Sequence, residues 1–129
     1  MNITAEENKL ALLVVAHGSR VEQSNQEVID LTKDVSKNAK SFSFVSHAFL
    51  EIAEPNIPKG IEHCIKAGSE KILILPYFLS AGRHVTEDIP NIINEYQTKY
   101  PKVIINLLPY FGQHEQVATI LGDIAEFNI

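Results

Sequence analysis

The stretch that decides the fold is LALLVVA, residues 10–16, followed directly by HGSR at 17–20. An unbroken aliphatic run of this length predicts a strand that is buried on both faces. Similar runs are SFVSHAFL at 43–50, KILILPYF at 71–78 and KVIINLLPY at 102–110. Three of the four lack polar/apolar alternation, as expected when helices cover both faces of a parallel sheet.

The segments between these runs, and after the last one, have the apolar spacing of amphipathic helices. The four apolar stripes are Val28, Leu31 and Val35; Ile57, Ile61, Cys64 and Ile65; Val85, Ile89, Ile92, Ile93 and Tyr96; and Val117, Ile120, Leu121 and Ile124. This β-α order predicts an α/β fold, with a four-stranded parallel sheet flanked by helices in a flavodoxin-like arrangement. Pro55 with Pro58 should start the second helix, and Pro90 places the start of the third near residues 86–89.

Bulk composition limits the classes of protein that this chain can represent. With 129 residues, 45% of them apolar and 21% charged, residues 1–129 are expected to form a single globular domain. The longest apolar run, 10–16, is too short for a bilayer, and Glu6 and Glu7 precede it where an export signal needs basic residues. We therefore expect a cytoplasmic protein without membrane association. The net charge of −5 argues against binding to nucleic acid.

Polar loops follow all four predicted strands. His17 leaves the first, Glu51 the second, SAGRH (80–84) the third and YFGQH (110–114) the fourth. Parallel strands bring these loops to one edge of the sheet, where open α/β sheets bind ligands. Glu51 and His84 are expected in loops just before helix N-termini, whose partial positive charge suits an anionic ligand.

The histidines His17 and His84 are the candidate metal ligands. Neutral imidazole binds divalent cobalt, iron and nickel, and two ligands would leave coordination positions open for metal transfer. A structural zinc site is excluded because a single cysteine cannot supply its thiolates. Glu51 is a third ligand, a proton acceptor or a solvated carboxylate, and the sequence leaves these open. His114 shares the same edge but has no obvious partner.

The only two arginines of the chain, Arg20 and Arg83, lie beside the two candidate ligands. Their planar guanidinium groups suit paired hydrogen bonds to ligand carboxylates or phosphates, although surface charges remain the alternative. Ser19 and Ser80 either donate to a ligand or cap their own loops, and capping is the default. Together with Gly82 in the third loop, these residues form the candidate substrate-binding set.

The remaining histidines and the cysteine are expected to be structural. His47 lies within the second predicted strand and is expected to be a satisfied core histidine. His63 lies off the apolar stripe of its helix and should be solvated. Cys64 lies on that stripe and should be a small core hydrophobe.

Three segments together resemble the small class II tetrapyrrole chelatases, the sirohydrochlorin cobaltochelatase and ferrochelatase family. They are VVAHGSR (14–20), AFLEIAEPNIPKGI (48–61) and ILILPYFLSAGRHVTEDIP (72–90), and the likeness spans nearly the whole chain. It implies an enzyme that inserts a divalent metal, cobalt first and iron or nickel as alternatives, into sirohydrochlorin for cobalamin or sirohaem synthesis. The metal is then a substrate, and no organic cofactor is expected.

By this resemblance His17 and His84 are the metal-binding and catalytic pair, and Glu51 is the acidic residue that closes the F-L-E stretch of the family. The fourth loop departs from the pattern, because Glu115 follows His114 where the family has proline. Longer members contain two copies of the unit. A chain of this length is thus expected to form a symmetric homodimer with a cleft built from both copies, or to be the first half of a longer protein.

Two other functions are weighed against the chelatase. HGSR resembles the Arg-His-Gly signature of histidine phosphatases superficially, but Ala16 stands where the arginine belongs. A metal or tetrapyrrole carrier would use the same two histidines without catalysis. The sequence does not separate a carrier from an enzyme, because an open two-histidine site serves delivery as well as insertion.

Overall fold

The computed structural model describes residues 9–129, apart from the side chain of His84. Its four parallel strands form one sheet in the order β2-β1-β3-β4. The strands are β1 (Leu10–Ala16), β2 (Phe44–Phe49), β3 (Lys71–Pro76) and β4 (Ile104–Leu107). The predicted parallel sheet is confirmed. The fourth strand is shorter than its apolar run, which continues to Pro109, a residue without an N–H for the sheet ladder.

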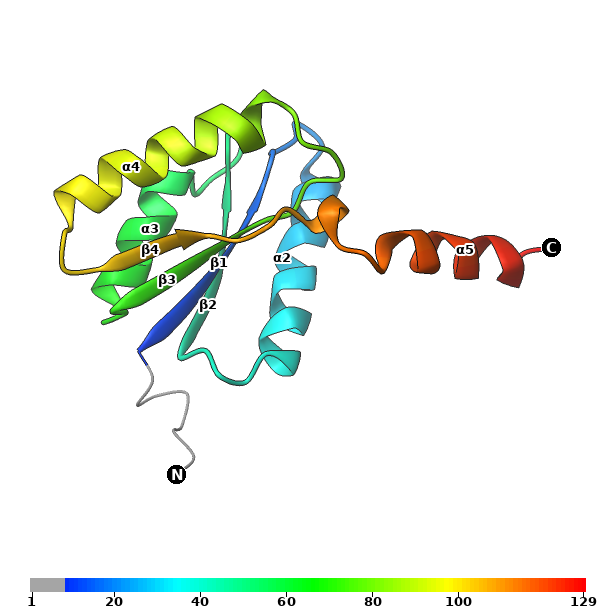
Figure 1. The fold of residues 1–129 in the computed structure, drawn as a ribbon, viewed down its shortest axis with the longest axis horizontal. Coiled ribbons are helices and arrows are strands. Elements are labelled where there is room, and N and C mark those ends of the chain that lie inside the picture. The colour runs from blue at the N-terminus through cyan, green and yellow to red at the C-terminus, as the bar shows by residue number, and fades with distance from the viewer. Residues whose placement is uncertain (1–8) are drawn as a thin grey trace.

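Four α-helices accompany the sheet, as the apolar stripes predict. They are α2 (Glu22–Asn38), α3 (Ile57–Lys66), α4 (Ile89–Lys99) and α5 (Val117–Phe127). Two short elements complete the chain, a π-helix η1 (His84–Asp88) directly before α4 and a 3₁₀ turn η2 (Phe111–Gln113). Helices α3 and α4 cover one face of the sheet and α2 lies on the other (Figure 1). This is the predicted flavodoxin-like arrangement.

The hydrophobic core lies between the sheet and the pair α3 and α4. Its fully buried members include Leu13, Val15, Ile57, Ile61, Cys64, Ile72, Ile74 and Ile89. Gly60 brings α3 close to the sheet, since a Cβ there would lie 2.8 Å from the Cβ of Ala48. Cys64 is a core residue, as predicted, and burial raises the pKa of its thiol to about 12.

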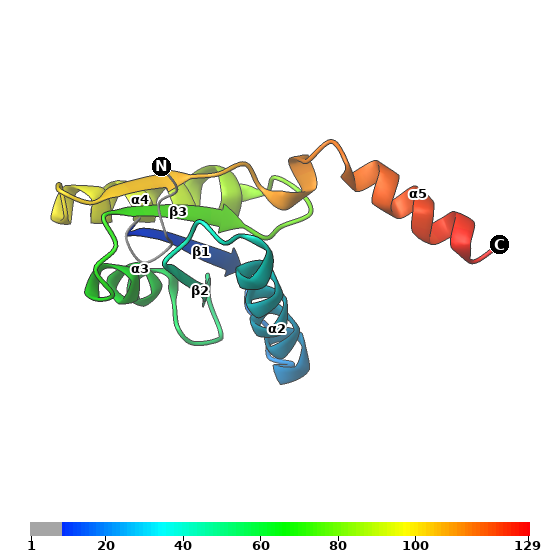
Figure 2. The same ribbon diagram turned by 90° about the horizontal axis from the view of Figure 1, so that it is seen from below.

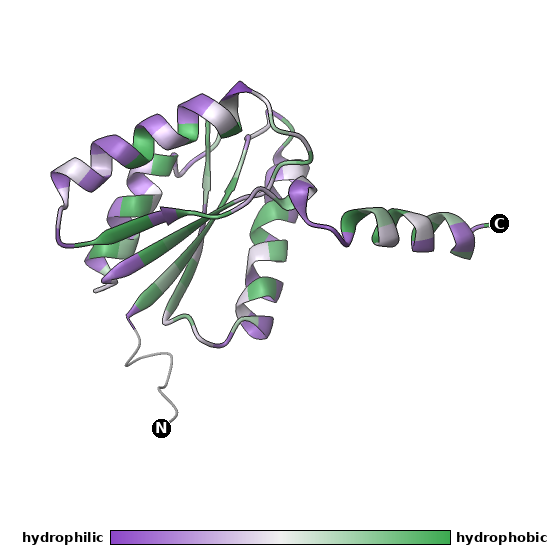
Figure 3. Cartoon of the chain, in the orientation of Figure 1, coloured by the Kyte–Doolittle hydropathy of each residue, from purple (hydrophilic) through white to green (hydrophobic). Residues whose placement is uncertain are grey.

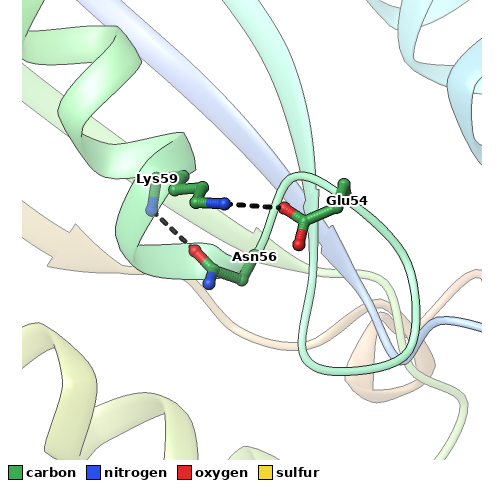
Figure 4. Close-up of polar contacts among 3 residues, drawn as sticks. All are labelled: Glu54, Asn56 and Lys59. Atoms are coloured by element: carbon green, nitrogen blue, oxygen red, sulfur yellow. Dashed lines mark hydrogen bonds and ion pairs between the residues drawn. The ribbon is translucent and has the colours of Figure 1, made fainter.

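The start of α3 is fixed by a side-chain cap. The Asn56 side chain accepts the Lys59 N–H at 2.9 Å, and the Lys59 ammonium lies 3.3 Å from the Glu54 carboxylate (Figure 4). Pro58 is in the first turn, as expected, whereas Pro55 precedes the cap. The Phe49 N–H donates to the Pro55 carbonyl at 2.8 Å, so residues 50–55 form a closed loop.

The third predicted helix begins earlier than expected. Winding starts at Gly82, whose carbonyl accepts the N–H groups of Val85 and Thr86, each at 3.1 Å. His84 is therefore the first residue of η1 and not part of a loop before the helix, which corrects the sequence expectation. Pro90 lies in the first turn of α4, and its missing N–H suits the change from the π to the α pattern.

Helix α5 does not pack on the sheet, although its apolar stripe predicts a helix that flanks it. None of its residues is buried, and it extends away from the rest of the molecule in both views (Figures 1 and 2). Neither α5 nor any other helix within residues 9–129 is long and apolar enough to cross a membrane.

Candidate active site

His17 and Glu51 form a pair at the carboxyl edge of the sheet. The pairing of β1 with β2 continues past the strand ends, where the Glu51 N–H donates to the His17 carbonyl at 3.0 Å. Their side chains meet at 2.8 Å, between His17 Nε2 and Glu51 Oε1. The side chains are 45% and 54% exposed, respectively. The carboxylate thus holds the imidazole in a fixed position that a ligand can still reach.

The loops of this pair approach each other only because residue 18 is glycine. Gly18 has a φ of +97°, and a Cβ there would overlap the Glu51 carbonyl oxygen. The next loop residue, Ile52, is 57% exposed and has a φ of +72°, an unfavourable conformation for a β-branched side chain. Backbone strain of this kind clusters at functional sites, which supports a functional role for the Glu51 loop.

The second predicted metal ligand, His84, lies in the third loop region at the start of η1. Its side chain is outside the described part of the structure, so the convergence of His84 with His17 stays a prediction. Among the side chains that the structure does describe, no three His, Cys, Asp or Glu groups are clustered so that they could hold a metal ion. The site that these side chains show is therefore the His17–Glu51 pair.

Both arginines are exposed. The Arg83 side chain is 79% exposed, and its Nε lies 3.5 Å from the Glu87 carboxylate one turn along η1. Arg20 is in the first loop, three residues after His17. The two guanidinium groups are thus accessible to an anionic ligand, and their contact with one stays a prediction.

Ser19 orders the first loop. Its Oγ accepts the Val21 N–H at 3.0 Å, in agreement with the default capping role. The Asn25 side chain brackets the backbone of Ser19: its Oδ1 accepts the Ser19 N–H at 2.9 Å and its Nδ2 donates to the Ser19 carbonyl at 2.7 Å. The sequence reasoning missed Asn25. Its signal was an asparagine, a weak helix former, in the first turns of a helix just after the loop.

Ser80 and Gly82 lie in the third loop, where both are exposed. The Ser80 carbonyl accepts the Gly82 N–H at 3.2 Å. A Cβ at Gly82 would meet no atom within 4 Å, so no packing requirement selects glycine there. Substrate contact by these residues stays a prediction.

The fourth loop packs against the third and gives His114 a structural partner. The Gly112 N–H donates to the Phe78 carbonyl at 2.9 Å, and a Cβ at Gly112 would overlap the Leu79 backbone. His114 Nδ1 accepts the Gln116 N–H at 3.1 Å, which orders the turn before α5.

His47 is not a core residue, contrary to the sequence expectation. It is half-buried on β2, which the strand order makes an edge strand, and its ring meets that of Phe49 edge-on with centroids 5.7 Å apart. Burial and the nearby Lys33 ammonium lower the pKa of His47. His63 is exposed, as predicted.

A half-exposed histidine–carboxylate pair at the carboxyl edge of a parallel α/β sheet is typical of proteins that bind or transform small molecules. The model of the CbiX family matches residues 11–126, and the chain belongs to that family. This confirms the resemblance to the class II chelatases. The chain is 34% identical over 120 residues to a sirohydrochlorin ferrochelatase of Priestia megaterium, covering 92% of this chain and 45% of the relative.

Two further proteins place the chain among relatives of different length. A sirohydrochlorin cobaltochelatase of Sulfolobus acidocaldarius is 29% identical over 117 residues, which cover 91% of this chain and 90% of the relative. The cobalt complex of the sirohydrochlorin chelatase SirB from Bacillus subtilis subspecies spizizenii matches with a TM-score of 0.79 at 32% identity, covering 92% of this chain and 50% of that one. The chain thus spans about half the length of several relatives and nearly all of another.

Proposed function

We propose that this chain is a chelatase that inserts a divalent metal into sirohydrochlorin, with cobalt as the first candidate and iron or nickel as alternatives. The observation that carries the proposal is the 2.8 Å His17–Glu51 pair at the carboxyl edge of the sheet. Support comes from relatives named sirohydrochlorin ferrochelatase and sirohydrochlorin cobaltochelatase. The metal is a substrate of this reaction.

In the proposed mechanism His17 and His84 receive the metal, and water fills its remaining coordination positions. Two pyrrole N–H protons must leave as the macrocycle takes the metal. Glu51 is assigned the role of proton acceptor, because its carboxylate already contacts the imidazole that releases the metal. His17 can accept the second proton once its metal bond breaks.

The charge of the substrate explains the need for exposed arginines. Sirohydrochlorin carries several carboxylates, and a chain with a net charge of −5 repels such an anion at long range. Arg20 and Arg83 are proposed to supply a local positive rim, with paired hydrogen bonds from each guanidinium. Arg83 would exchange its contact with Glu87 for one with the substrate, at little cost because that ion pair is exposed.

A cleft deep enough for a macrocycle is proposed to form between two copies of the chain. The relatives of about twice its length offer room for two such units in one polypeptide, and a symmetric homodimer would supply the same pair of units from separate chains. The His17–Glu51 pair is half-exposed in one copy, as expected of a site that is completed by a second surface.

The deciding experiment mixes the protein with sirohydrochlorin and cobalt(II) and follows the absorbance change of the macrocycle. We expect a rate well above that of the uncatalysed reaction, and loss of this rate in His17→Ala. Binding of the metal or the tetrapyrrole without any acceleration would identify a carrier and overturn the enzymatic proposal.

A further inference from the structure

Helix α5 carries an apolar surface that nothing within the described chain covers. Hydrophobic residues recur along the helix (Figure 3). Ile120 is 47% exposed, Leu121 62%, Ile124 58% and Phe127 89%. An amphipathic helix whose apolar side faces water is rare in a monomeric protein and marks an interaction surface. We call the side formed by these four residues and Val117 the α5 stripe.

The sheet carries a matching uncovered surface. Side chains alternate along β3, so Ile72 and Ile74 enter the core under α3 and α4 while Leu73 and Leu75 point to the opposite face. On that opposite face α2 packs against β2, and no helix of residues 9–129 covers β3 and β4. We call this surface the open face; it consists of Leu73, Leu75, Tyr77, Ile104 and Phe111. A hollow at its border with α2 is lined by Val14, Leu31, Val35, Leu75, Tyr77 and Phe111.

We propose that the α5 stripe of one copy covers the open face of a second copy, and that the second copy returns the same contact. The inference rests on the homodimer of the proposed function but not on its metal or substrate. An exchange of this kind is isologous, so a single contact is made twice and the assembly closes as a dimer. Each copy thereby gains the missing helix layer of its sheet.

The turn before α5 directs the helix toward a second copy instead of its own sheet. Three residues, 114–116, separate η2 from α5. His114 fixes this turn, because its carbonyl accepts the Val117 N–H at 3.1 Å and its Nδ1 accepts the Gln116 N–H at 3.1 Å. With the turn held this way, α5 points out of the molecule (Figures 1 and 2). Folding back onto its own open face would require both hydrogen bonds to break.

The area of the proposed contact matches what a stable dimer needs. Burying one large apolar side chain removes about 60–120 Å² from water, so the five residues of the α5 stripe would bury about 300–600 Å². The receiving face buries a similar area, and the contact occurs twice, which gives about 1,200–2,400 Å² in total. Stable protein interfaces bury about 1,200–2,000 Å², so the exchanged helices alone suffice.

The oligomeric state tests the proposal first. Wild-type protein should be a dimer by size-exclusion chromatography with light scattering at micromolar concentration. The double variant Leu121→Asp/Ile124→Asp should be a folded monomer by the same measurement and by circular dichroism. Thr119→Asp introduces the same charge on the opposite side of α5 and should remain dimeric. A monomeric wild type, or a double variant that stays dimeric, would overturn the inference.

Cross-linking between copies tests the exchange itself. Leu31→Cys places a thiol on α2 beside the open face, where Leu31 is 37% exposed, and Leu121→Cys places one on the α5 stripe. The native Cys64 is fully buried and should not react. After refolding of a tagged Leu31→Cys chain with an untagged Leu121→Cys chain, a short bismaleimide should join the two.

Two outcomes of the cross-linking experiment would overturn the exchange. The first is a cross-link inside a single chain when both cysteines are placed on one molecule, which would mean that α5 folds back. The second is equally efficient cross-linking of Leu121→Cys to itself, which would mean that α5 pairs with α5. The insertion assay separates this inference from the proposed function: a monomer that inserts cobalt refutes only the exchange, and a cross-linked dimer that inserts nothing refutes only the chelatase.

Discussion

Gly18 and the main chain of Glu51 lie in direct contact across the first two loops, so that a Cβ on residue 18 would overlap the Glu51 carbonyl oxygen. The same approach places His17 Nε2 at 2.8 Å from Glu51 Oε1. A residue without a side chain therefore sets the geometry of the pair that carries the proposed chemistry.

Gly18→Ala should damage both stability and activity, and Gly68→Ala is its matched control. Both glycines have positive φ, +97° and +91°, but a Cβ at Gly68 would meet no atom within 4 Å. We expect Gly68→Ala to cost about 1 kcal/mol of unfolding free energy. Gly18→Ala should cost more and slow metal insertion about tenfold or more, because the two loops must separate. Denaturant unfolding and the insertion rate measure the two effects, and equal effects of both substitutions would contradict the role of Gly18.

Glu51→Gln should remove the proton acceptor and keep the shape of the loop. We expect insertion to slow by about 10²-fold and the unfolding free energy to change by less than about 1 kcal/mol, because the pair is half-exposed. Glu54→Gln provides the control, since Glu54 is an exposed carboxylate of the same loop whose contact is with Lys59. Loss of insertion in both variants would point to a general effect on the loop instead of a role for Glu51.

The two candidate metal ligands are tested by His17→Ala and His84→Ala. Each should abolish insertion and weaken cobalt binding, measured by the absorbance of the metal complex, with an unchanged circular dichroism spectrum. His63→Ala is the control, because His63 is exposed on α3. Full activity in both His17→Ala and His84→Ala would refute the assignment of the site.

Arg83→Ala should raise KM for sirohydrochlorin about tenfold and leave kcat nearly unchanged, because the guanidinium is proposed to contact substrate carboxylates. The difference from wild type should shrink as salt is added, since salt screens exposed charges. Lys99→Ala serves as the control: Lys99 is another exposed cation paired with a carboxylate, that of Glu62 at 3.4 Å, at the end of α4. An unchanged KM in Arg83→Ala would reduce this residue to a surface charge.

The buried Cys64 should make stability depend on alkaline pH. Burial raises the pKa of its thiol to about 12, so the folded state keeps the proton while the unfolded chain loses it above its ordinary pKa near 8.5. The unfolded state then binds fewer protons, and the unfolding free energy should fall as the pH rises from about 9 toward 12. Other groups titrate in the same window, so the quantity to measure is the difference between wild type and Cys64→Ala. A difference that is constant over this window would contradict the prediction.

Local pattern was sufficient for most of the architecture and for the position of the site. The run 10–16 became β1 with the same bounds, and the parallel order of strands brought His17 and Glu51 to one edge as expected. Two predictions failed because they depend on neighbours that are distant in sequence. His47 was expected in the core, but β2 pairs on one side only. His84 was expected in a loop, but the Gly82 carbonyl starts the helical winding before it.

The sequence by itself determined the secondary structure, the α/β class and the loops that carry the functional groups, because apolar periodicity and prolines act over a few residues. Only the tertiary structure decided that His17 and Glu51 touch, that His114 serves the turn before α5, and that the α5 stripe faces away from its own sheet. Those relationships depend on the relative placement of loops and helices. A helical stripe predicts an apolar surface that will be buried, but it does not specify which surface, or which copy of the chain, covers it.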